Sequence, residues 1–456
     1  MRMRLRWIDP EVMSVDTREG RLTLGALFVP LFIEQLLMNL MGTVNTLVLG
    51  RYSDEAVAAV GAANQVVTLV FTFYAVISGG TSIVISHRLG AGKRKEASDA
   101  AFTSLLFSGA LSFGCGIVLA AFAQPVMAML NLQGEVLFMA VRYFRIVIGF
   151  SFMQGIISAA SAILRSYGRP KLAVGASILM NAVNALLNYL VVFHPDRMPV
   201  GGAEGIGVAN VIAHVAAMVM ILICLAAAKL ELDFGKKNIK ALCCLPAILK
   251  VGVPGGISSL SYSLSQVVST SILGVLGTTA LSAKVYISSV VFYVYVVGMS
   301  LGLSTAILTG WMTGAKEYDK AYRLNQQVLR LAVSLNIVLS VLLLLFHRPI
   351  LGLFTRNQEI IKMAGSVLFI DIFVEIGRAF NHVEDNSLRG AGDVMFPMVV
   401  SIISCWLISI LFSYILGIGL GLGLAGCWVA FMLDELFRGF SFWKRFRTKK
   451  WMEKKV

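Results

Sequence analysis

Five ionisable side chains recur along one apolar stretch near residues 359–388. They are spaced four, three, four and three residues apart: Asp371, Glu375, Arg378, His382 and Asp385. At about 100° per residue, this spacing places all five on one face of a helix. A charged side chain at the centre of a bilayer costs about 2.5–3.5 kcal/mol on insertion scales, so this face must turn toward protein or water. Buried carboxyl groups can bind a proton or a sodium ion reversibly, and we expect Asp371 and Glu375 to do so.

Arg378 lies one helical turn from Glu375, and two interpretations of this pair stay open. The two residues either form a permanent structural ion pair, or the guanidinium sets how readily the nearby carboxyl groups take up an ion. Asp371 has no obvious partner on its own helix. Asp434 and Arg438, four residues apart in the last apolar stretch, are expected to join the same network.

His382 is expected to be a hydrogen-bonding member of this network rather than a metal ligand. No second His or Cys is spaced to complete a metal site with it. It is also the histidine, among the five in the chain, that we expect to be buried.

The N-terminal half has one conspicuous intramembrane acid, Glu34, which we expect to assist ion coupling. Asn45 follows eleven residues later on the same helical face. Asn181, Asn184 and Asn188 form an amide stripe that either stitches helices together or lines a cavity. Tyrosine faces can also receive an organic cation. The candidates for a substrate cavity are therefore Gln35, Asn45, Gln154, Asn181, Asn184, Asn188, Tyr262, Tyr293 and His382.

The elements that position these residues are long apolar segments. Of the 456 residues, 57% are hydrophobic and 14% are charged, whereas soluble domains carry about 25% charged residues. About 20 apolar residues cross the hydrocarbon core as a helix. Twelve such spans are predicted, near 24–50, 56–86, 98–123, 135–164, 172–193, 203–228, 247–276, 280–311, 321–346, 359–388, 395–418 and 422–443.

The net charge of +14 follows from membrane topology. Lys and Arg concentrate in the connections on one side and in the C-terminal tail, as in Arg88, Lys93 and Lys444. This positive-inside pattern predicts a multi-pass protein of the cell membrane with both termini in the cytoplasm, and it argues against nucleic-acid binding. The six cysteines show no metal-ligand spacing. We expect neither a signal peptide nor an appended soluble domain.

The sequence also overlays on itself at one constant offset. The offset that places Pro30 on Pro254 also places Gly168 on Gly392, and we call it the repeat offset. The two prolines are either static kinks or hinges. Each half holds six spans, an even number, so the halves are parallel repeats. We predict an all-α polytopic membrane protein with two six-helix lobes around a central cleft, divided as 1–228, an inter-lobe loop at 229–245, and 246–456.

The repeat favours a transporter, because rocking of two similar lobes can open a cleft to alternate sides. A duplication with only structural meaning is the alternative. The repeat also provides a comparison for the charged stripe. The positions equivalent to it are small or polar without charge: Val147, Ser151, Gln154, Ser158 and Ser161. Any coupling that depends on acidic residues should therefore be asymmetric.

Motifs in both halves carry a family resemblance. An early proline is followed by small-residue runs at 56–59 and 280–283. A Gly90-Ala91-Gly92-Lys93 segment comes next, and Ala162–Lys171 (AILRSYGRPK) is echoed by Ser387–Asp393 (SLRGAGD). On these motifs the chain resembles the multidrug and toxic compound extrusion (MATE) efflux antiporters over nearly its whole length. The resemblance implies twelve helices in two lobes and export of amphipathic cations against inward proton or sodium flow.

The chain departs from that family at three positions. Asn45 stands where members commonly have Asp in the first helix. Tyr262 stands where some sodium-coupled members have Glu, and Arg378 falls near their acid in the tenth helix.

We therefore expect a cation-coupled antiporter that exports small amphipathic or cationic organic compounds by alternating access. Asp371, Glu375, Arg378, Glu34 and Asp434 are the ion-coupling candidates, with sodium binding possible at Asp371 and Glu375. We expect no cofactor beyond the coupling ion (H⁺ or Na⁺), no other metal, and a functional monomer in the bilayer. The alternatives are a flippase for a lipid-linked sugar or another lipid and, from another class, a membrane-embedded enzyme.

Overall fold

The structure is a computed structural model. It describes residues 9–17, 20–49, 53–130, 132–194, 200–228, 230, 244–355 and 357–454; for 40–49 and 54 it describes the backbone alone. Asn45 therefore lies outside the residues whose side chains are described.

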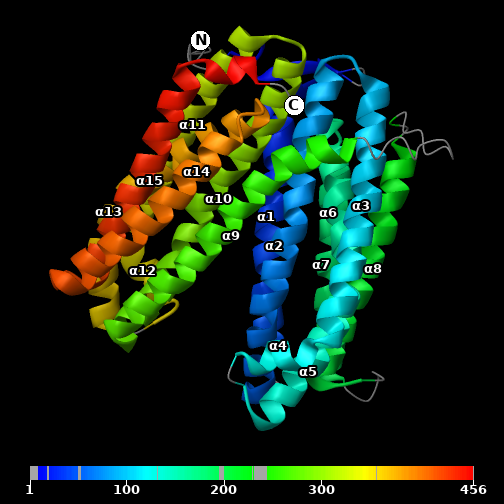
Figure 1. Ribbon diagram of the computed structural model, residues 1–456. Helices are drawn as coiled ribbons and strands as arrows, with labels where there is room; N and C mark the ends of the chain where they lie inside the picture. The colour runs from blue at the N-terminus through cyan, green and yellow to red at the C-terminus, as the bar shows by residue number, and fades with distance from the viewer. Residues whose placement is uncertain are drawn as a thin grey trace, which may run out of the picture. The chain divides into compact units, whose positions relative to one another are not determined.

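Helices make up nearly all of the N-terminal half (Figure 1). They are α1 (Leu24–Leu49), α2 (Asp54–Gly90), α3 (Arg94–Ala121), the short α4 (Ala123–Ala128), α5 (Gly134–Gly149), α6 (Phe152–Ser166), α7 (Pro170–Phe193) and α8 (Gly202–Ala227). The C-terminal half contains α9 (Leu245–Val275), α10 (Thr278–Gly314), α11 (Tyr318–Leu345), the short α12 (His347–Gly352), α13 (Gln358–Gly390), α14 (Met395–Ile403) and α15 (Gly423–Arg447). Two π-helical segments, Ser404–Ile410 and Ser413–Gly419, continue α14, and a 3₁₀ turn at Lys450–Glu453 follows α15.

The helix bounds confirm the internal repeat. Shifted by the repeat offset, the bounds of α2, α3 and α4 coincide with those of α10, α11 and α12. The turns after the fourth span of each half are also equivalent, because Gly168 and Gly392 have φ of 81° and 88°. Only glycine adopts this left-handed conformation readily, so these two positions require it.

The fourth span departs from its repeat partner. A bend of 44° separates α5 from α6, whereas the equivalent α13 is continuous. Gly149 and Ser151 border the bend, and glycine and serine are frequent at helix kinks. The equivalent residues, Phe373 and Glu375, belong to an unbroken helix.

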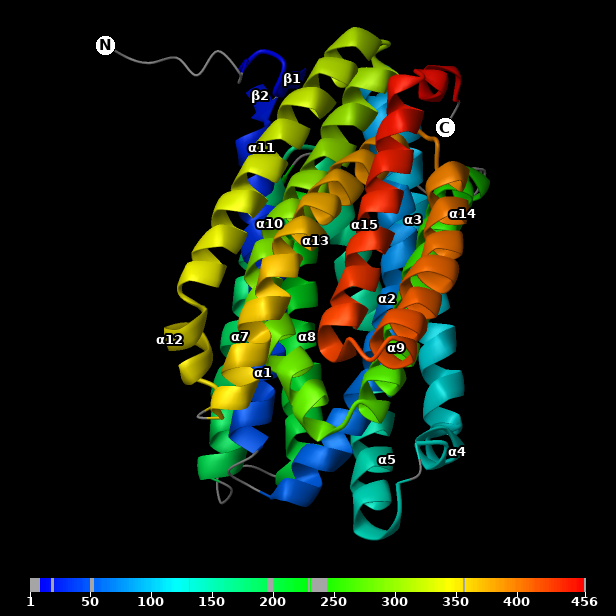
Figure 2. The same cartoon turned by 90° about the vertical axis from the view of Figure 1, so that its left-hand side faces the viewer.

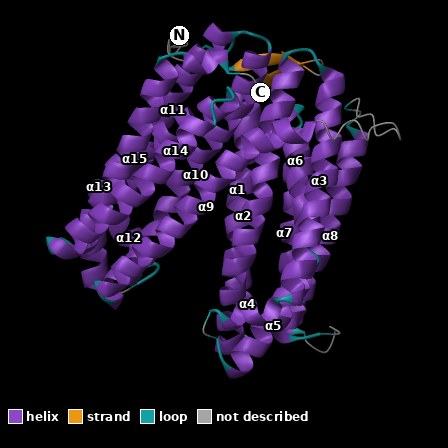
Figure 3. Ribbon diagram, viewed as in Figure 1, coloured by secondary structure: helices purple, strands orange, loops and turns teal. Residues whose placement is uncertain are grey.

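The twelve predicted spans are confirmed to within several residues when α5–α6 and α14 with its π-helical continuation are each counted once. Seven of the described helices are long and apolar enough to cross a membrane, and the bent α5–α6 pair is an eighth. The sequence did not predict the short helices α4 and α12 or the antiparallel hairpin of β1 (Ser14–Thr17) and β2 (Gly20–Thr23), drawn in orange in Figure 3.

The helices form two compact units. The N-terminal unit is Val29–Gly256, and the C-terminal unit combines Ile257–Val456 with Met1–Phe28. The division therefore falls inside α1 and inside α9, in each case close to the helix proline, Pro30 or Pro254. The predicted lobe boundaries (1–228 and 246–456) stay a prediction, and most of the predicted inter-lobe loop, 231–243, lies outside the described residues.

In the N-terminal unit, α2 packs against α3, α5 and α6, and α7 packs against α8. The first turns of α9 lie against α2 at glycines. A Cβ atom on Gly80 would overlap the carbonyl oxygen of Ile248, and one on Gly252 would lie 2.6 Å from that of Val76. Because no side chain fits there, the two backbones can touch and hold this part of α9 in the N-terminal unit.

In the C-terminal unit, α13 is central and packs against α10, α11 and α15 (Figure 2). The hairpin belongs to this unit, where β1 packs on α10. The backbone N–H of Asp9 also donates to Oε1 of Gln327 on α11, at 2.9 Å. The segment that precedes α1 is thus attached to the C-terminal unit, although α1 continues into the other one.

Candidate functional site

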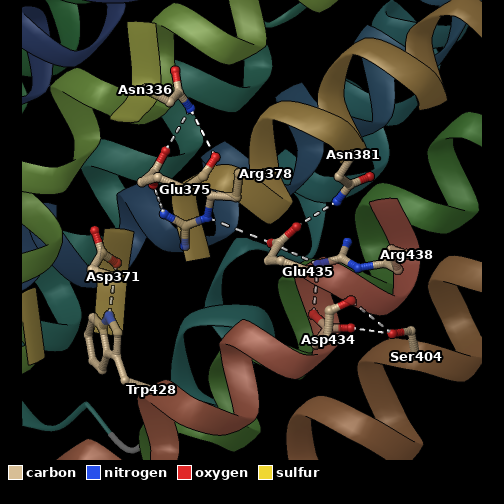
Figure 4. A network of polar contacts seen from close by, with 10 residues as sticks. All are labelled: Asn336, Asp371, Glu375, Arg378, Asn381, Ser404, Trp428, Asp434, Glu435 and Arg438. Carbon is tan, nitrogen blue, oxygen red and sulfur yellow. Dashed lines mark hydrogen bonds and ion pairs between the residues drawn. The ribbon is translucent and has the colours of Figure 1, made fainter. Parts of the chain in front are cut away.

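A buried network of charged side chains joins α13 to α15 in the C-terminal unit (Figure 4). Its acidic members are Asp371, Glu375, Asp434 and Glu435, which are at most 5% exposed. Its guanidinium groups belong to Arg378 and Arg438. We call these six residues the charge network. The helical spacing predicted the face of α13 that contributes to it, and the structure brings α15 against that face.

Arg378 and Glu375 form the predicted ion pair. Their Nη1 and Oε1 atoms are 2.5 Å apart. The other carboxylate oxygen of Glu375 accepts a hydrogen bond of 3.1 Å from the side-chain amide of Asn336 on α11. Glu375 is therefore fully partnered in this state, with one contact on its own helix and one on the neighbouring helix.

Glu435, which was not among the predicted site residues, links the two arginines. Its carboxylate lies 2.8 Å from Nη2 of Arg438 and 3.7 Å from Nε of Arg378. It also accepts a hydrogen bond of 2.7 Å from the side-chain amide of Asn381. One signal could have identified it: Glu435 is three residues before Arg438 and therefore shares the helix face that was assigned to Asp434 and Arg438.

Asp434 joins the network as expected. Its carboxylate lies 2.7 Å from Nη2 of Arg438 and accepts a hydrogen bond of 2.5 Å from the Ser404 hydroxyl. Ser404 opens the first π-helical segment, so this irregular part of the eleventh span contributes a donor to the site. The predicted pair of Asp434 and Arg438 is confirmed.

Asp371 differs from the other three acids. Its Oδ1 atom accepts a hydrogen bond of 2.9 Å from the indole N–H of Trp428 on α15, and its Oδ2 atom has no hydrogen-bond partner among the described residues. Within the described part of the chain, it is the one network carboxyl group that has no ion pair with Lys, Arg or His. A carboxylate that is 1% exposed and lacks a cation is costly to keep charged.

Aromatic rings lie against the guanidinium groups of the network. The Tyr295 ring centre is 5.6 Å from Cζ of Arg378, and that of Tyr262 is 5.7 Å from Cζ of Arg438. Tyr262, a predicted cavity residue, thus lies beside the network. Tyr293 is 61% exposed and is not part of the network.

The expected hydrogen bond of His382 is not formed by its Nε2 atom, which is buried and meets no partner in the described part of the chain. The ring instead packs edge-on against Tyr295, with centroids 4.9 Å apart. The expectation that His382 alone is buried was also wrong, because His214 on α8 is only 8% exposed and bonds the carbonyl oxygen of Asn210. Asp385, the last member of the stripe, pairs separately with Arg389 at 2.7 Å.

The amide stripe of the N-terminal unit stitches helices together. Asn188 donates to Asn184 at 3.0 Å, and Asn184 donates to Asn210 of α8 at 2.5 Å. Asn210 donates to the hydroxyl of Tyr143, which itself donates to Asn64. This chain connects α7, α8, α5 and α2, the first of the two interpretations that the sequence left open.

The other cavity candidates of this unit have local contacts or are partly buried. Asn181 donates to the Ser177 carbonyl oxygen of its own helix, and Gln154 donates to Ser158. Gln35 is partly buried on α1.

Glu34 forms an ion pair within the N-terminal unit. Nη1 of Arg165, at the C-terminal end of α6, lies 3.0 and 2.9 Å from the two carboxylate oxygens of Glu34. The side chains are only 13% (Glu34) and 18% (Arg165) exposed. Glu34 was predicted as a site residue without a partner, because Arg165 is 131 residues away in the sequence.

Across the described residues, no three His, Cys, Asp or Glu side chains are grouped to hold a metal ion. The oxygen atoms of the charge network instead face guanidinium, amide, hydroxyl and indole donors.

Two six-helix repeats with long apolar helices and a buried charge network define a multi-pass membrane protein of the secondary-transporter class. The family model described as MatE matches residues 30–190 and 254–415, two segments that begin at the equivalent prolines of the repeat. The chain belongs to the MatE family.

Relatives support this assignment over nearly the full length. The chain is 36% identical over 434 residues to "Uncharacterized transporter YisQ" of Bacillus subtilis, covering 95% of each protein. It is 26% identical over 447 residues to "Probable multidrug resistance protein NorM" of Thermotoga maritima, covering 97% of this chain and 95% of that protein.

Solved structures share the fold. One described as "Crystal structure of MATE in the straight conformation" matches with a TM-score of 0.86 and 20% identity, over 94% of this chain and 96% of that one. An "outward-facing conformation of a multidrug resistance MATE family transporter" matches with a TM-score of 0.85 and 20% identity, over the same shares of the two chains. The predicted family and the twelve-helix fold in two lobes are confirmed. These relatives do not support the flippase alternative, and members of this family are transporters rather than enzymes.

Proposed function

We propose that the protein is an antiporter of the cell membrane that exports small organic cations in exchange for protons or sodium ions. It acts as a monomer, and both of its termini are in the cytoplasm. The C-terminal charge network binds the coupling ion, and no cofactor takes part.

The observation that carries this proposal is the excess of acid in the network. Four buried carboxyl groups face two guanidinium groups, so two negative charges stay uncompensated when all six residues are ionised. A protein interior in a membrane tolerates such an excess poorly. A proton or sodium ion that enters the network removes part of the excess.

Asp371 is the entry point for that ion, because the other three acids are already paired with arginine. Its unpartnered Oδ2 atom can accept a proton or coordinate sodium. Arg378 and Glu375, one turn further along α13, extend the effect to Glu435 and hence to α15. Loading of Asp371 therefore changes the electrostatic balance between two packed helices and favours one arrangement of the protein over another.

The proposed substrate class follows from the same charge balance. A network that carries excess negative charge and has tyrosine rings nearby attracts organic cations rather than anions. Several relatives are named as probable multidrug resistance proteins, which supports the export of organic compounds.

Efflux from liposomes tests the proposal, with ethidium as the cationic probe and a proton or sodium gradient imposed separately. Asp371→Asn and Glu375→Gln should each reduce gradient-driven efflux at least about tenfold. The control is Asp319→Asn on α11, whose side chain is 82% exposed, and it should transport like the parent protein. If both network variants keep parental efflux, the coupling ion does not bind there.

A further inference from the structure

The ion pair of Glu34 and Arg165 has an equivalent in the other unit. At the repeat offset, Glu34 corresponds to Ser258 and Arg165 corresponds to Arg389. In the structure, Nη2 of Arg389 donates to the hydroxyl of Ser258 at 3.4 Å, over the same sequence separation of 131 residues. In each half, the arginine that ends the fourth span therefore reaches the first span one turn after its proline.

The charges of the two contacts are arranged differently. In the N-terminal unit the carboxylate partner of the arginine is on the first helix, as Glu34. In the C-terminal unit it is Asp385, which lies on the same helix as Arg389, with its Oδ1 atom 2.7 Å from Nε of Arg389. The residue equivalent to Asp385 is Ser161. Acid and serine have thus exchanged places between the halves, so at these equivalent positions the ion pair joins the first and fourth spans in the N-terminal unit but lies within α13 in the C-terminal unit.

The position of the pair on α1 gives it a mechanical role. The segment up to Phe28 belongs to the C-terminal unit, and Val29 begins the part held by the N-terminal unit. Glu34 follows little more than one turn later. Pro30 lies between Phe28 and Glu34; it lacks a backbone N–H and so removes one hydrogen bond of the helix. The part of α1 that would bend if the units moved relative to one another is therefore the short stretch between Phe28 and Glu34.

We propose that Arg165 and Glu34 form a clamp that positions α1 in the N-terminal unit throughout the transport cycle. Both side chains are mostly buried, so water screens their attraction less than that of a surface pair. Glu34 is then a positioning residue, and its carboxylate is occupied by Arg165 instead of binding the coupling ion. The inference depends on transport by this chain but not on which ion drives it.

The repeat supplies the variant that tests the clamp. The double substitution E34S/S161D moves the carboxylate onto α6, as in the C-terminal half, so Arg165 keeps a charged partner while the link to α1 is lost. We expect the maximal rate of ethidium efflux to fall at least about fivefold, with the KM for the driving ion unchanged. A rise in that KM without a fall in rate would assign Glu34 to ion binding and overturn the clamp.

Two further variants separate the clamp from a general packing effect. E34R/R165E restores the pair with reversed charges and should regain most of the lost rate; if it folds but stays as slow as E34S/S161D, the proposal fails. E204S breaks another helix-linking ion pair of the same unit, Arg142–Glu204, which does not involve α1. It should transport normally, and an equal loss in E204S would also contradict the clamp.

A measurement without substrate or gradient distinguishes failure of the clamp from failure of the proposed function. In a chain whose six native cysteines are replaced, the substitution Ile33→Cys reports on α1 just before Glu34. Its labelling by a maleimide should become at least about fivefold faster in E34S/S161D. Unchanged labelling would show that the ion pair does not hold α1, whatever the result for efflux.

Discussion

Arg438 should be the residue whose loss damages the charge network most. It pairs with both Asp434 and Glu435, at 2.7 and 2.8 Å. Arg438→Gln therefore leaves Asp434 buried without an ion pair, and Glu435 keeps only the longer ion pair with Arg378 beside its hydrogen bond from Asn381. Removal of one partner from a buried ion pair costs about 3–5 kcal/mol. Since two carboxylates lose this partner, the upper part of that range applies.

Glu435→Gln should lower the free energy of unfolding less than Arg438→Gln, although Glu435 contacts both arginines. After this change Arg438 keeps Asp434, and Arg378 keeps Glu375. The loss is then mainly that of charge-assisted hydrogen bonds, about 1.5–3 kcal/mol. Lys449→Gln is the control, because Lys449 forms an exposed pair with Asp319 at 3.7 Å. Such a pair contributes about 0–1 kcal/mol.

Thermal unfolding in detergent, followed by tryptophan fluorescence, measures this order. The apparent Tm should be lowest for Arg438→Gln and intermediate for Glu435→Gln, and Lys449→Gln should match the parent protein. Equal Tm values for the two network variants would mean that Arg438 does not neutralise two acids, and the electrostatic reasoning would be refuted.

Three further outcomes are expected. Gly80→Ala should lower the apparent Tm, because its Cβ would overlap a backbone oxygen and overpacking costs about 1–3 kcal/mol of stability. Gly79→Ala is the matched control and should not lower it, because a Cβ there meets no atom of another described element within 4 Å. Trp428→Phe removes the indole donor to Asp371, and the KM for the driving ion in liposome efflux should change severalfold, whereas an unchanged value would exclude Asp371 from ion binding. Asn210→Ala breaks the amide chain of the N-terminal unit, and it should cost about 1–3 kcal/mol of stability without altering the ion dependence of efflux by the folded protein.

Much of the fold could be predicted from the sequence because its signals are local. A bilayer-spanning helix must be apolar over a fixed length, so composition alone located the twelve spans. The repeat followed from the recurrence of residues such as Pro30 and Pro254 at one offset. The charged face of α13 and the pair of Asp434 and Arg438 followed from the helical period, which relates residues within one helix.

What only the tertiary structure decided depends on how helices rotate and pack against one another. Asn336 and Trp428 complete the site from other helices, and no spacing along α13 indicates which residue of a neighbour faces Glu375 or Asp371. The partnership of Glu34 with Arg165 spans 131 residues. The first turns of α1 belong to the C-terminal unit and those of α9 to the N-terminal unit. For α9 this assignment depends on packing contacts such as those at Gly80. A periodic sequence specifies which side chains share a face, but the packed neighbour determines what that face meets.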